Sequence, residues 1–325
     1  MATNLWNNLL ETNADLSAGS KTETAVVISA ESQGVLQDFL VRVLEVPDAN
    51  ASLSSIGYYC KDYGLDSGRP NDTVLHIYTL GWPVTPMNLD LLSIFVKPGA
   101  RSIKWVFLLD WLDGNKKLWL RSLQEGFELV NKKLQRDPCE IDDSSIVCMQ
   151  SQCCKNLEVA TAAWSSLKME FINQALRSVA FLKHASLLAL ETYTSKKDII
   201  EIGKVATGQN TSKAPEYIQL NKLFIPKNSD SEGKIKTMGE KFPVHMVLEE
   251  SFISGQFERL IPGEPNSEPI TDPGSPRKVV QLEEVDIQKE LTEAYNLQKA
   301  SLLENKTTSP ASQIEPLNNS DLAGP

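Results

Sequence analysis

The chain has 325 residues, of which 41% are hydrophobic and 23% are charged, and its formal net charge is −10 at pH 7. This length allows one α/β domain with tails, or two small domains. The negative balance argues against broad nucleic-acid binding, which needs a basic surface, and it fits a soluble protein that binds partners. Many cytosolic proteins are mildly acidic, so the charge by itself selects no partner.

Cysteine and histidine usage predicts neither disulfides nor a metal site. There are five cysteines, an odd number that includes an adjacent pair, which is not a disulfide framework. The spacing of Cys148, Cys153 and Cys154 is not that of a zinc site, and the three histidines are not paired at ligand spacing. The N-terminus lacks the features of a signal peptide, and no run approaches the roughly 18 apolar residues of a membrane span. We therefore expect an intracellular chain with reduced thiols and no cofactor.

The first elements in the chain have the order of a phosphate-binding loop. Residues 25–28 are an apolar strand, residues 29–34 a turn, and residues 35–46 an amphipathic helix. A working P-loop reads G-x-x-x-x-G-K-[ST], and its Lys reaches the phosphates while its hydroxyl ligates magnesium. The degenerate phosphate loop of this chain comprises Ser29, Ser32, Gly34, Val35 and Leu36.

Two of these replacements remove the chemistry of the loop. Val35 stands in the Lys position and Leu36 in the Ser/Thr position, while Ser29 replaces the first Gly. Neither aliphatic side chain can contact a phosphate as a cation or ligate Mg²⁺. Backbone N–H groups of residues 31–35 still offer a helix N-terminus, which attracts anions without side chains. We expect a GTPase-like frame that no longer hydrolyses nucleotide.

Strands and helices alternate through the rest of the first 208 residues. Strands are predicted at residues 55–60, 73–80, 104–110, 145–149 and 186–190, and helices at residues 5–10, 119–135, 160–182 and 199–205. Two early strands in succession indicate an antiparallel pair, as in small GTPases. The predicted fold class is α/β: a degenerate P-loop, small-GTPase-like domain with a mainly parallel sheet, plus an extended C-terminal segment and a tail helix.

Other nucleotide-binding elements are reduced as well. Where a GTPase has Asp-x-x-Gly, residues 78–81 keep only Gly81. Where it has Asn-Lys-x-Asp, residues 150–153 read Gln-Ser-Gln-Cys and offer no carboxylate for a guanine base. Residues 194–196 are a weak match to a Ser-Ala-Lys loop. Together these losses favour a scaffold over an enzyme.

The second half of the chain changes character after Gly208. The predicted organisation is an N-terminal helix and lead-in at 1–22, the GTPase-like domain at 23–208, an extension packed on it at 209–260, a Pro-rich linker at 261–282, an amphipathic helix at 283–304 and a disordered tail at 305–325. The helix begins with acidic residues, which suits the positive end of its dipole. Its apolar face either folds back onto the domain or binds a partner in a groove.

These features, taken in order, resemble one family, the light intermediate chains of cytoplasmic dynein, and most closely its divergent fungal members. The resemblance covers most of the chain. It rests on a Leu5-Trp6 helix before the phosphate-loop strand, a buried strand ending in Asp110-Trp111, and a Tyr-Thr-Ser element at 193–195. Its most specific part is Leu-Phe-Ile-Pro at 223–226, followed by a Ser-Asp-Ser-x-x-Lys-Ile turn at 229–235.

The resemblance implies a non-catalytic subunit of the dynein motor in the cytoplasm, associated with microtubules. The GTPase-like domain would bind the dynein heavy chain, and the C-terminal helix would meet cargo adaptors. Surface aromatics suit such contacts, although large apolar side chains are more often buried. The candidate partner-binding residues are Trp105, Trp111, Trp119, Phe224, Ile287, Leu291, Tyr295 and Leu302.

Two alternatives stay open at this point. One is a diverged small-GTPase-like protein that binds or hydrolyses nucleotide through unusual motifs, against which Val35 in the Lys position is the main evidence. The other is a GTPase-like subunit of a different complex, such as a membrane-targeting receptor. The absence of an apolar membrane segment counts against the second.

Overall fold

A seven-stranded sheet forms the centre of the computed structural model, which describes residues 22–47, 49–53, 56–63, 73–96, 102–134, 141–160, 162–237 and 241–263. The strand order is β2-β3-β1-β4-β5-β6-β7. The strands are β1 (Thr22–Ala30), β2 (Gly57–Tyr63), β3 (Thr73–Gly81), β4 (Ser102–Asp110), β5 (Ile141–Met149), β6 (Ser186–Leu190) and β7 (Phe224–Ile225). β2 and β7 are antiparallel to their neighbours and the other pairings are parallel. The predicted mainly parallel sheet with an antiparallel pair of early strands is confirmed, and that pair, β2 and β3, lies at one edge of the sheet.

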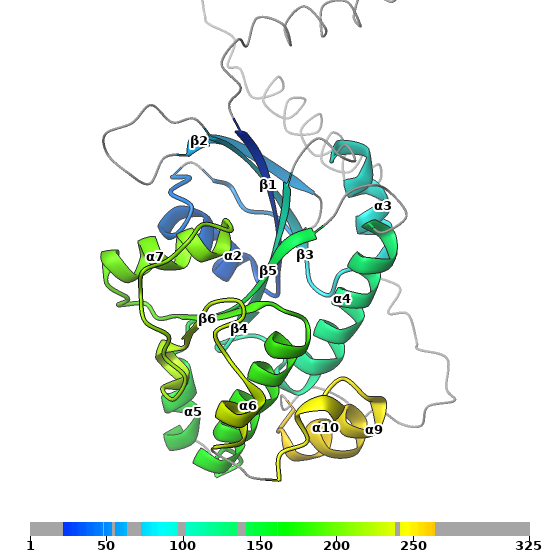
Figure 1. Cartoon of the computed structure of the whole chain (residues 1–325), viewed down its shortest axis with the longest axis vertical. Coiled ribbons are helices and arrows are strands. Elements are labelled where there is room, and N and C mark those ends of the chain that lie inside the picture. Colours follow the sequence, from blue (N-terminus) through cyan, green and yellow to red (C-terminus); the bar gives the residue numbers. More distant parts are fainter. Residues whose placement is uncertain are drawn as a thin grey trace, which may run out of the picture. The chain divides into compact units, whose positions relative to one another are not determined.

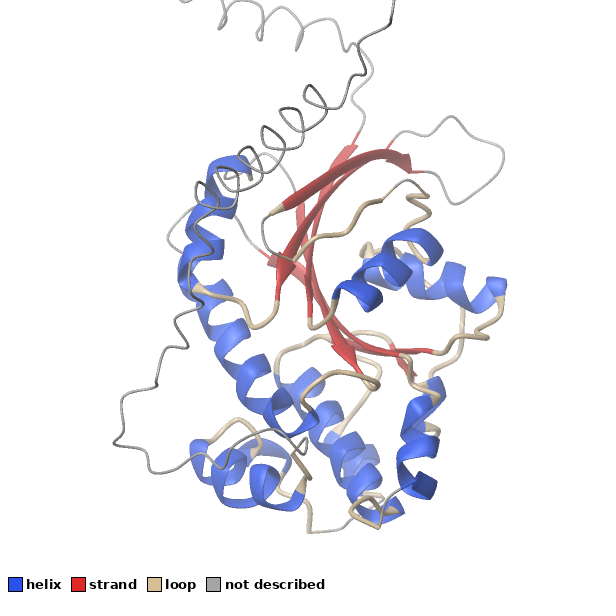
Figure 2. Cartoon of the chain, turned by 180° about the vertical axis from the view of Figure 1, so that it is seen from behind, coloured by secondary structure: helices blue, strands red, loops and turns tan. Residues whose placement is uncertain are grey.

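Helices cover both faces of this sheet (Figures 1 and 2). They are α2 (Gln33–Arg42), α3 (Pro86–Phe95), α4 (Trp119–Leu134), α5 (Cys153–Ala160), α6 (Ser166–Leu182) and α7 (Lys196–Ala206), followed by the short α8 (Glu232–Lys236), α9 (Glu250–Phe252) and α10 (Glu258–Leu260). α2 and α7 supply buried residues to one apolar core, whereas α3, α4 and α6 supply the other. None of the helices in the described ranges is long and apolar enough to cross a membrane.

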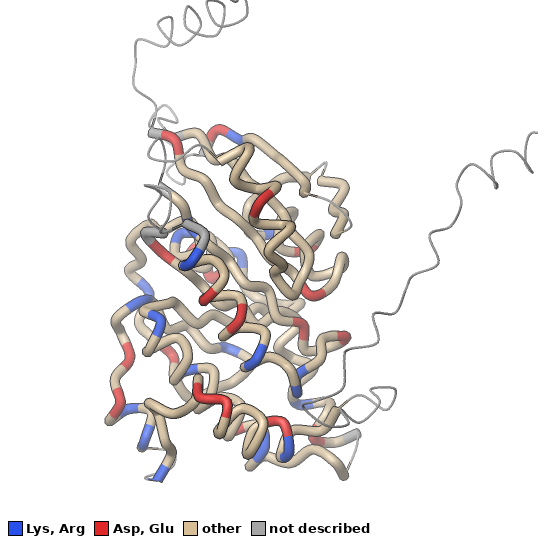
Figure 3. The backbone as a smooth tube through the Cα atoms, turned by 90° about the vertical axis from the view of Figure 1, so that its right-hand side faces the viewer, with Lys and Arg blue, Asp and Glu red and all other residues tan. Residues whose placement is uncertain are grey.

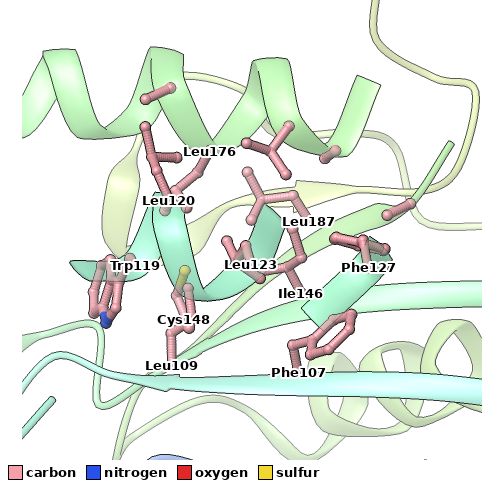
Figure 4. Close-up of a cluster of buried hydrophobic side chains, with 14 of the residues drawn as sticks. Phe107, Leu109, Trp119, Leu120, Leu123, Phe127, Ile146, Cys148, Leu176 and Leu187 are labelled. Carbon is pink, nitrogen blue, oxygen red and sulfur yellow. The ribbon is translucent and has the colours of Figure 1, made fainter. Parts of the chain in front are cut away.

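The central strand β4 shows why the sheet lies between two cores. Trp105, Phe107 and Leu109 alternate with Val106 and Leu108, and successive side chains of a strand point to opposite faces. Both sets are fully buried, so the strand is apolar along nearly its whole length, as expected for a parallel strand covered on both sides. Figure 4 shows the first of these cores, where Phe107 and Leu109 of β4 face residues of α4 and α6.

The structure corrects the predicted helices at four places. α3 and α5 are absent from the predicted elements, although Thr85 and Pro86 carry a start signal: the Thr85 side chain accepts a hydrogen bond from Asn88 N, and Pro86 fills the first turn. The helix predicted at 160–182 begins at Ser166, because Ser165 caps it by accepting from Lys168 N. The helix predicted at 35–46 begins at Gln33 and ends at Arg42.

Residues 209–263 add an edge strand and a helical cover to the domain. β7 pairs with β6, and the apolar residues Phe242, Val244, Phe252 and Phe257 are buried in the core that lies under α4 and α6. Figure 1 shows α9 and α10 beside α6. In Figure 3 basic and acidic positions are interspersed along the described backbone.

A buried ion pair helps to fix this extension on the domain. The guanidinium of Arg177 on α6 donates to both carboxylate oxygens of Asp230, at 2.8 and 2.9 Å. The two side chains are 1% and 5% exposed, so this is an interior pair. The predicted helix at 5–10, most of the linker at 261–282 and the helix at 283–304 lie outside the described residues.

Candidate functional site

The candidate site lies where β1 and β4 end and α2 begins. The strand order reverses between these two neighbouring strands, because β3 lies on one side of β1 and β4 on the other. In open α/β sheets ligands bind beyond the carboxyl ends of the strands at such a switch point. This is the position of the phosphate loop predicted from the sequence.

The connection from β1 to α2 is shorter than predicted. β1 continues to Ala30 and α2 begins at Gln33, so Glu31 and Ser32 alone join them. Ser29, predicted as a loop residue, is a buried strand residue, and its Oγ has no hydrogen-bond partner among the described residues. The predicted turn at 29–34 is therefore wrong, because the apolar run of β1 extends the strand and Ser32 starts the helix at once.

The residues in the Lys and Ser/Thr positions belong to the core. Val35 and Leu36 lie in the first turn of α2 and are fully buried. Ser32 caps this helix, since its Oγ accepts a hydrogen bond from Val35 N at 3.3 Å. Gly34 follows in the first turn, where a Cβ would find room, since the nearest atom to it would be Ser32 Oγ at 3.9 Å. The helix N-terminus is thus partly satisfied by its own cap.

Glu31, the first residue of this connection, directs its carboxylate to the end of β4 and to Trp119. Its Oε2 accepts a hydrogen bond from Asp110 N at 2.6 Å, and its two carboxylate oxygens lie 2.9 and 3.0 Å from Trp119 Nε1. Gly114 makes room for this carboxylate, because a Cβ at that position would collide with Glu31 Oε2 and with the carbonyl oxygen of Asp110. A carboxylate from the chain itself therefore lies beside the helix N-terminus.

A second carboxylate, that of Asp110, binds the start of α2. Asp110, fully buried at the end of β4, accepts from Ser32 Oγ at 2.7 Å and from Leu112 N at 2.8 Å. The ammonium group of Lys116 is directed to a neighbouring carbonyl and donates to Leu112 O at 3.2 Å. Asp110 and Ser32 thereby tie β4 to the start of α2.

The electrostatics of the site disfavour an anion. The pKa of Glu31 is raised to about 7, chiefly by burial and also by the charge of Asp110, which together outweigh the lowering by the hydrogen bonds from Asp110 N and Trp119 and by the charge of Lys116. A phosphate group placed at this helix N-terminus would meet two carboxyl groups rather than a Lys side chain. No group of three or more His, Cys, Asp or Glu side chains suited to a metal occurs in the described part of the chain.

The two loops that would read a guanine base bind each other. Gln152 Nε2 donates to Thr192 Oγ1 at 2.6 Å, and Thr192 N donates to Gln152 Oε1 at 3.0 Å. Asn221 Nδ2 donates to Glu191 Oε1. Ser195, in the weak Ser-Ala-Lys match, caps α7 by accepting from Asp198 N at 3.2 Å. Gln152 and Thr192 therefore join the loops after β5 and β6, while Glu191 and Ser195 bind the extension and the start of α7.

The comparison with known proteins is decisive for the family. The chain is 30% identical over 303 residues to the cytoplasmic dynein intermediate light chain DYN3 of Eremothecium gossypii, which covers 90% of this chain and 80% of the relative. The chain belongs to the cytoplasmic dynein intermediate light chain family. The corresponding protein of Saccharomyces cerevisiae is 28% identical over 262 residues, covering 77% of this chain and 81% of that relative. No protein-family model matches the chain.

A solved structure agrees at the level of the fold. The crystal structure of the dynein light intermediate chain's conserved domain aligns with a TM-score of 0.57 at 19% sequence identity, covering 77% of this chain and 94% of that one. At this identity the likeness concerns the fold alone. The family resemblance and the fold class inferred from the sequence are both confirmed.

The aromatic residues expected at a partner surface of this dynein intermediate light chain lie in its interior. Trp105, Trp111, Trp119 and Phe224 are at most 1% exposed. The rings of Trp111 and Trp119 pack edge to face with centroids 4.9 Å apart, and Trp119 binds Glu31. Their expected exposure is wrong, and the alternative of core packing holds for all four. The remaining candidates, Ile287, Leu291, Tyr295 and Leu302, lie outside the described residues.

Sequence reasoning missed the residues that determine this site. Glu31, Gly114 and the role of Asp110 were not singled out, because a motif search asks which P-loop residues are missing and not what replaces them. One signal was available: Glu31 is an acidic residue directly after an apolar strand, two positions before the first residue of the helix. Its partner Trp119 is 88 residues away in sequence, so no local pattern links the two.

Proposed function

We propose that this chain is a non-catalytic light intermediate chain subunit of the cytoplasmic dynein motor. The single observation that carries the subunit role is the 30% identity over 90% of the chain to a protein named as a cytoplasmic dynein intermediate light chain. In this proposal the GTPase-like domain binds the dynein heavy chain. The C-terminal region links the motor to adaptors or cargo for transport along microtubules in the cytoplasm.

The absence of catalysis is argued from the closed phosphate position. Val35 and Leu36 are core residues, and the carboxyl groups of Glu31 and Asp110 lie at the start of α2, where a P-loop would hold a phosphate. Phosphoryl transfer relies on cations that neutralise developing negative charge. Side chains that add negative charge at this position support a domain kept for its shape and its binding surfaces.

Affinity purification tests the subunit role directly. The full chain with a C-terminal tag is recovered from its native cytosol, and the associated proteins are identified by mass spectrometry. Co-purification of a dynein heavy chain in near-stoichiometric amount is the expected result. If the heavy chain is absent from the purified material, the proposal fails.

The nucleotide content of the same preparation tests the non-catalytic role. Acid extraction and chromatography should yield far less than one nucleotide per chain, and added GTP or ATP should not be turned over. Stoichiometric nucleotide with measurable turnover would instead support the diverged nucleotide hydrolase considered from the sequence.

The tail helix predicted at 283–304 is proposed as the adaptor-binding element. Leu291 and Leu302 lie on its predicted apolar face, whereas Asn296 and Ala300 lie on the opposite face. The double variant Leu291→Asp, Leu302→Asp should keep the heavy chain and lose adaptors in the purification. The matched variant Asn296→Asp, Ala300→Asp introduces the same two side chains on the opposite face and should keep both. Loss of adaptors from both variants, or from neither, contradicts this assignment.

A further inference from the structure

Helix α3 is apolar on two opposite faces, and only one of them is packed in the described structure. Leu89, Leu92 and Val96 point into the core and are 3 to 4% exposed. On the other side Met87 is 79% exposed, Leu91 41%, Ile94 71% and Phe95 54%. A helix that is apolar all round is normally buried all round, and four neighbouring large apolar side chains on a surface mark a docking site.

We propose that this outer face of α3 is the docking site of the chain's own N-terminal segment, with Leu5, Trp6, Leu9 and Leu10 against Met87, Leu91, Ile94 and Phe95. The spacing of the four N-terminal residues places them on one side of a short helix. Asn4, Asn7, Asn8 and Glu11 fall on its other side. The segment therefore has an apolar stripe, which is shorter than that of α3, and a polar opposite side.

The connection between the two elements favours this occupant. β1 begins at Thr22, and Thr24 pairs with Ser102 at the start of β4. α3 ends at Phe95, seven positions before Ser102, so it ends within roughly 25 Å of that point. Residues 11–21 join the segment to β1 and can span roughly 36 Å when extended. In Figure 1 α3 lies toward the end of the sheet from which β1 starts.

Charge favours the N-terminal segment over the predicted tail helix as the occupant of this face. Asp90 is the one charged residue within α3, and residues 2–10 carry no charged side chain. Residues 283–304 contain six acidic and two basic side chains. A neutral apolar stripe therefore suits the face of α3 better than a strongly acidic helix, which would bring like charges toward Asp90.

Site-specific photo-crosslinking in the full chain tests the proposal. A benzophenone amino acid replaces Ile94, the protein is irradiated, and crosslinked peptides are identified by mass spectrometry. The expected main product joins α3 to the peptide that contains residues 5–10 of the same chain. The same probe at Leu167, which is 76% exposed on α6, should not give that product.

Two variants make the test specific. Leu5→Asp with Leu9→Asp should reduce the product at least about tenfold, because two buried leucines contribute most of such a contact. Asn7→Asp with Asn8→Asp adds the same charges on the polar side and should leave the product unchanged. Hydrogen exchange of the α3 amides should increase in the first variant and not in the second.

Each other occupant gives a distinct result that overturns the proposal. A crosslink to the tail helix, to a heavy chain, or between isotopically labelled and unlabelled copies would assign the face elsewhere. An absence of any crosslink to residues 5–10, together with unchanged hydrogen exchange, would show that the face stays uncovered.

Discussion

The buried carboxyl group of Glu31 makes the stability of this domain depend on pH in a defined direction. Its pKa is about 7 in the folded chain, against an ordinary value of 4.5, chiefly because it is buried. A group whose pKa is raised by folding binds its proton more tightly in the folded state, so the free energy of unfolding falls as pH rises from about 4.5 to about 7. The difference between the two pKa values corresponds to roughly 3 kcal/mol.

The variant Glu31→Gln removes this dependence, because its side chain stays neutral at every pH. The free energy of unfolding of each chain is measured by urea unfolding followed by circular dichroism. The difference between the variant and the unmodified chain should change in favour of the variant by up to roughly 3 kcal/mol from pH 5 to pH 8. The variant also loses one hydrogen bond to Trp119. This loss changes the free energy of unfolding by the same amount at each pH, so it does not alter the pH dependence of the difference.

A second glutamate supplies the control. Arg121 lowers the pKa of Glu250, so the contribution of Glu250 is present above its ordinary pKa and is lost as pH falls below it. Glu250→Gln should therefore change the free energy of unfolding by the same amount at pH 5 and at pH 8. A Glu31→Gln difference that is equally flat over this range would refute the burial argument.

Three further substitutions test the packing around the site and the extension. Gly114→Ala should lower the free energy of unfolding by about 2 to 4 kcal/mol in a urea titration, because its Cβ would collide with the carboxylate of Glu31 and the carbonyl oxygen of Asp110. The control is Gly233→Ala, where the space is open. It should be neutral or stabilising by up to about 1 kcal/mol in the same titration. Trp119→Phe should cost about 1 to 3 kcal/mol at pH 8, measured in the same way, because it removes an indole donor from a buried carboxylate; no loss there would contradict that bond. Asp230→Asn should cost about 3 to 5 kcal/mol, since it removes a carboxylate that pairs with the buried guanidinium of Arg177 at 2.8 Å. A thermal melt showing an unchanged transition would contradict the role of the pair.

The fold was predictable wherever residues adjacent in sequence carry the pattern. The long apolar run at 104–110 and the alternating one at 73–80 gave β4 and β3 nearly to the residue. α3 was missed because its outer face is as apolar as its inner one, so it lacks the periodicity that marks an amphipathic helix. α5 was missed because it has only eight residues, and the helix predicted at 160–182 begins where α5 ends.

The site was predictable only in what it lacks. The replacement of the phosphate-binding Lys by Val35 can be read directly from the sequence. The partners that close the position cannot, because Glu31 is 79 residues from Asp110 and 88 from Trp119. The same limit explains the four aromatic residues: composition says that they suit an interface, whereas burial depends on which elements pack over them.

The sequence by itself determined the family, the order of strands and helices, and the loss of the P-loop side chains, because each of these depends on residue types at fixed spacing along the chain. Tertiary structure alone decided that β1 runs on to Ala30, that the carboxyl group of Glu31 binds Asp110 N and Trp119, and that one face of α3 has no partner among the described residues. The physical reason is that burial and hydrogen bonding of a side chain are set by neighbours that the fold brings from distant positions. A local pattern records none of them.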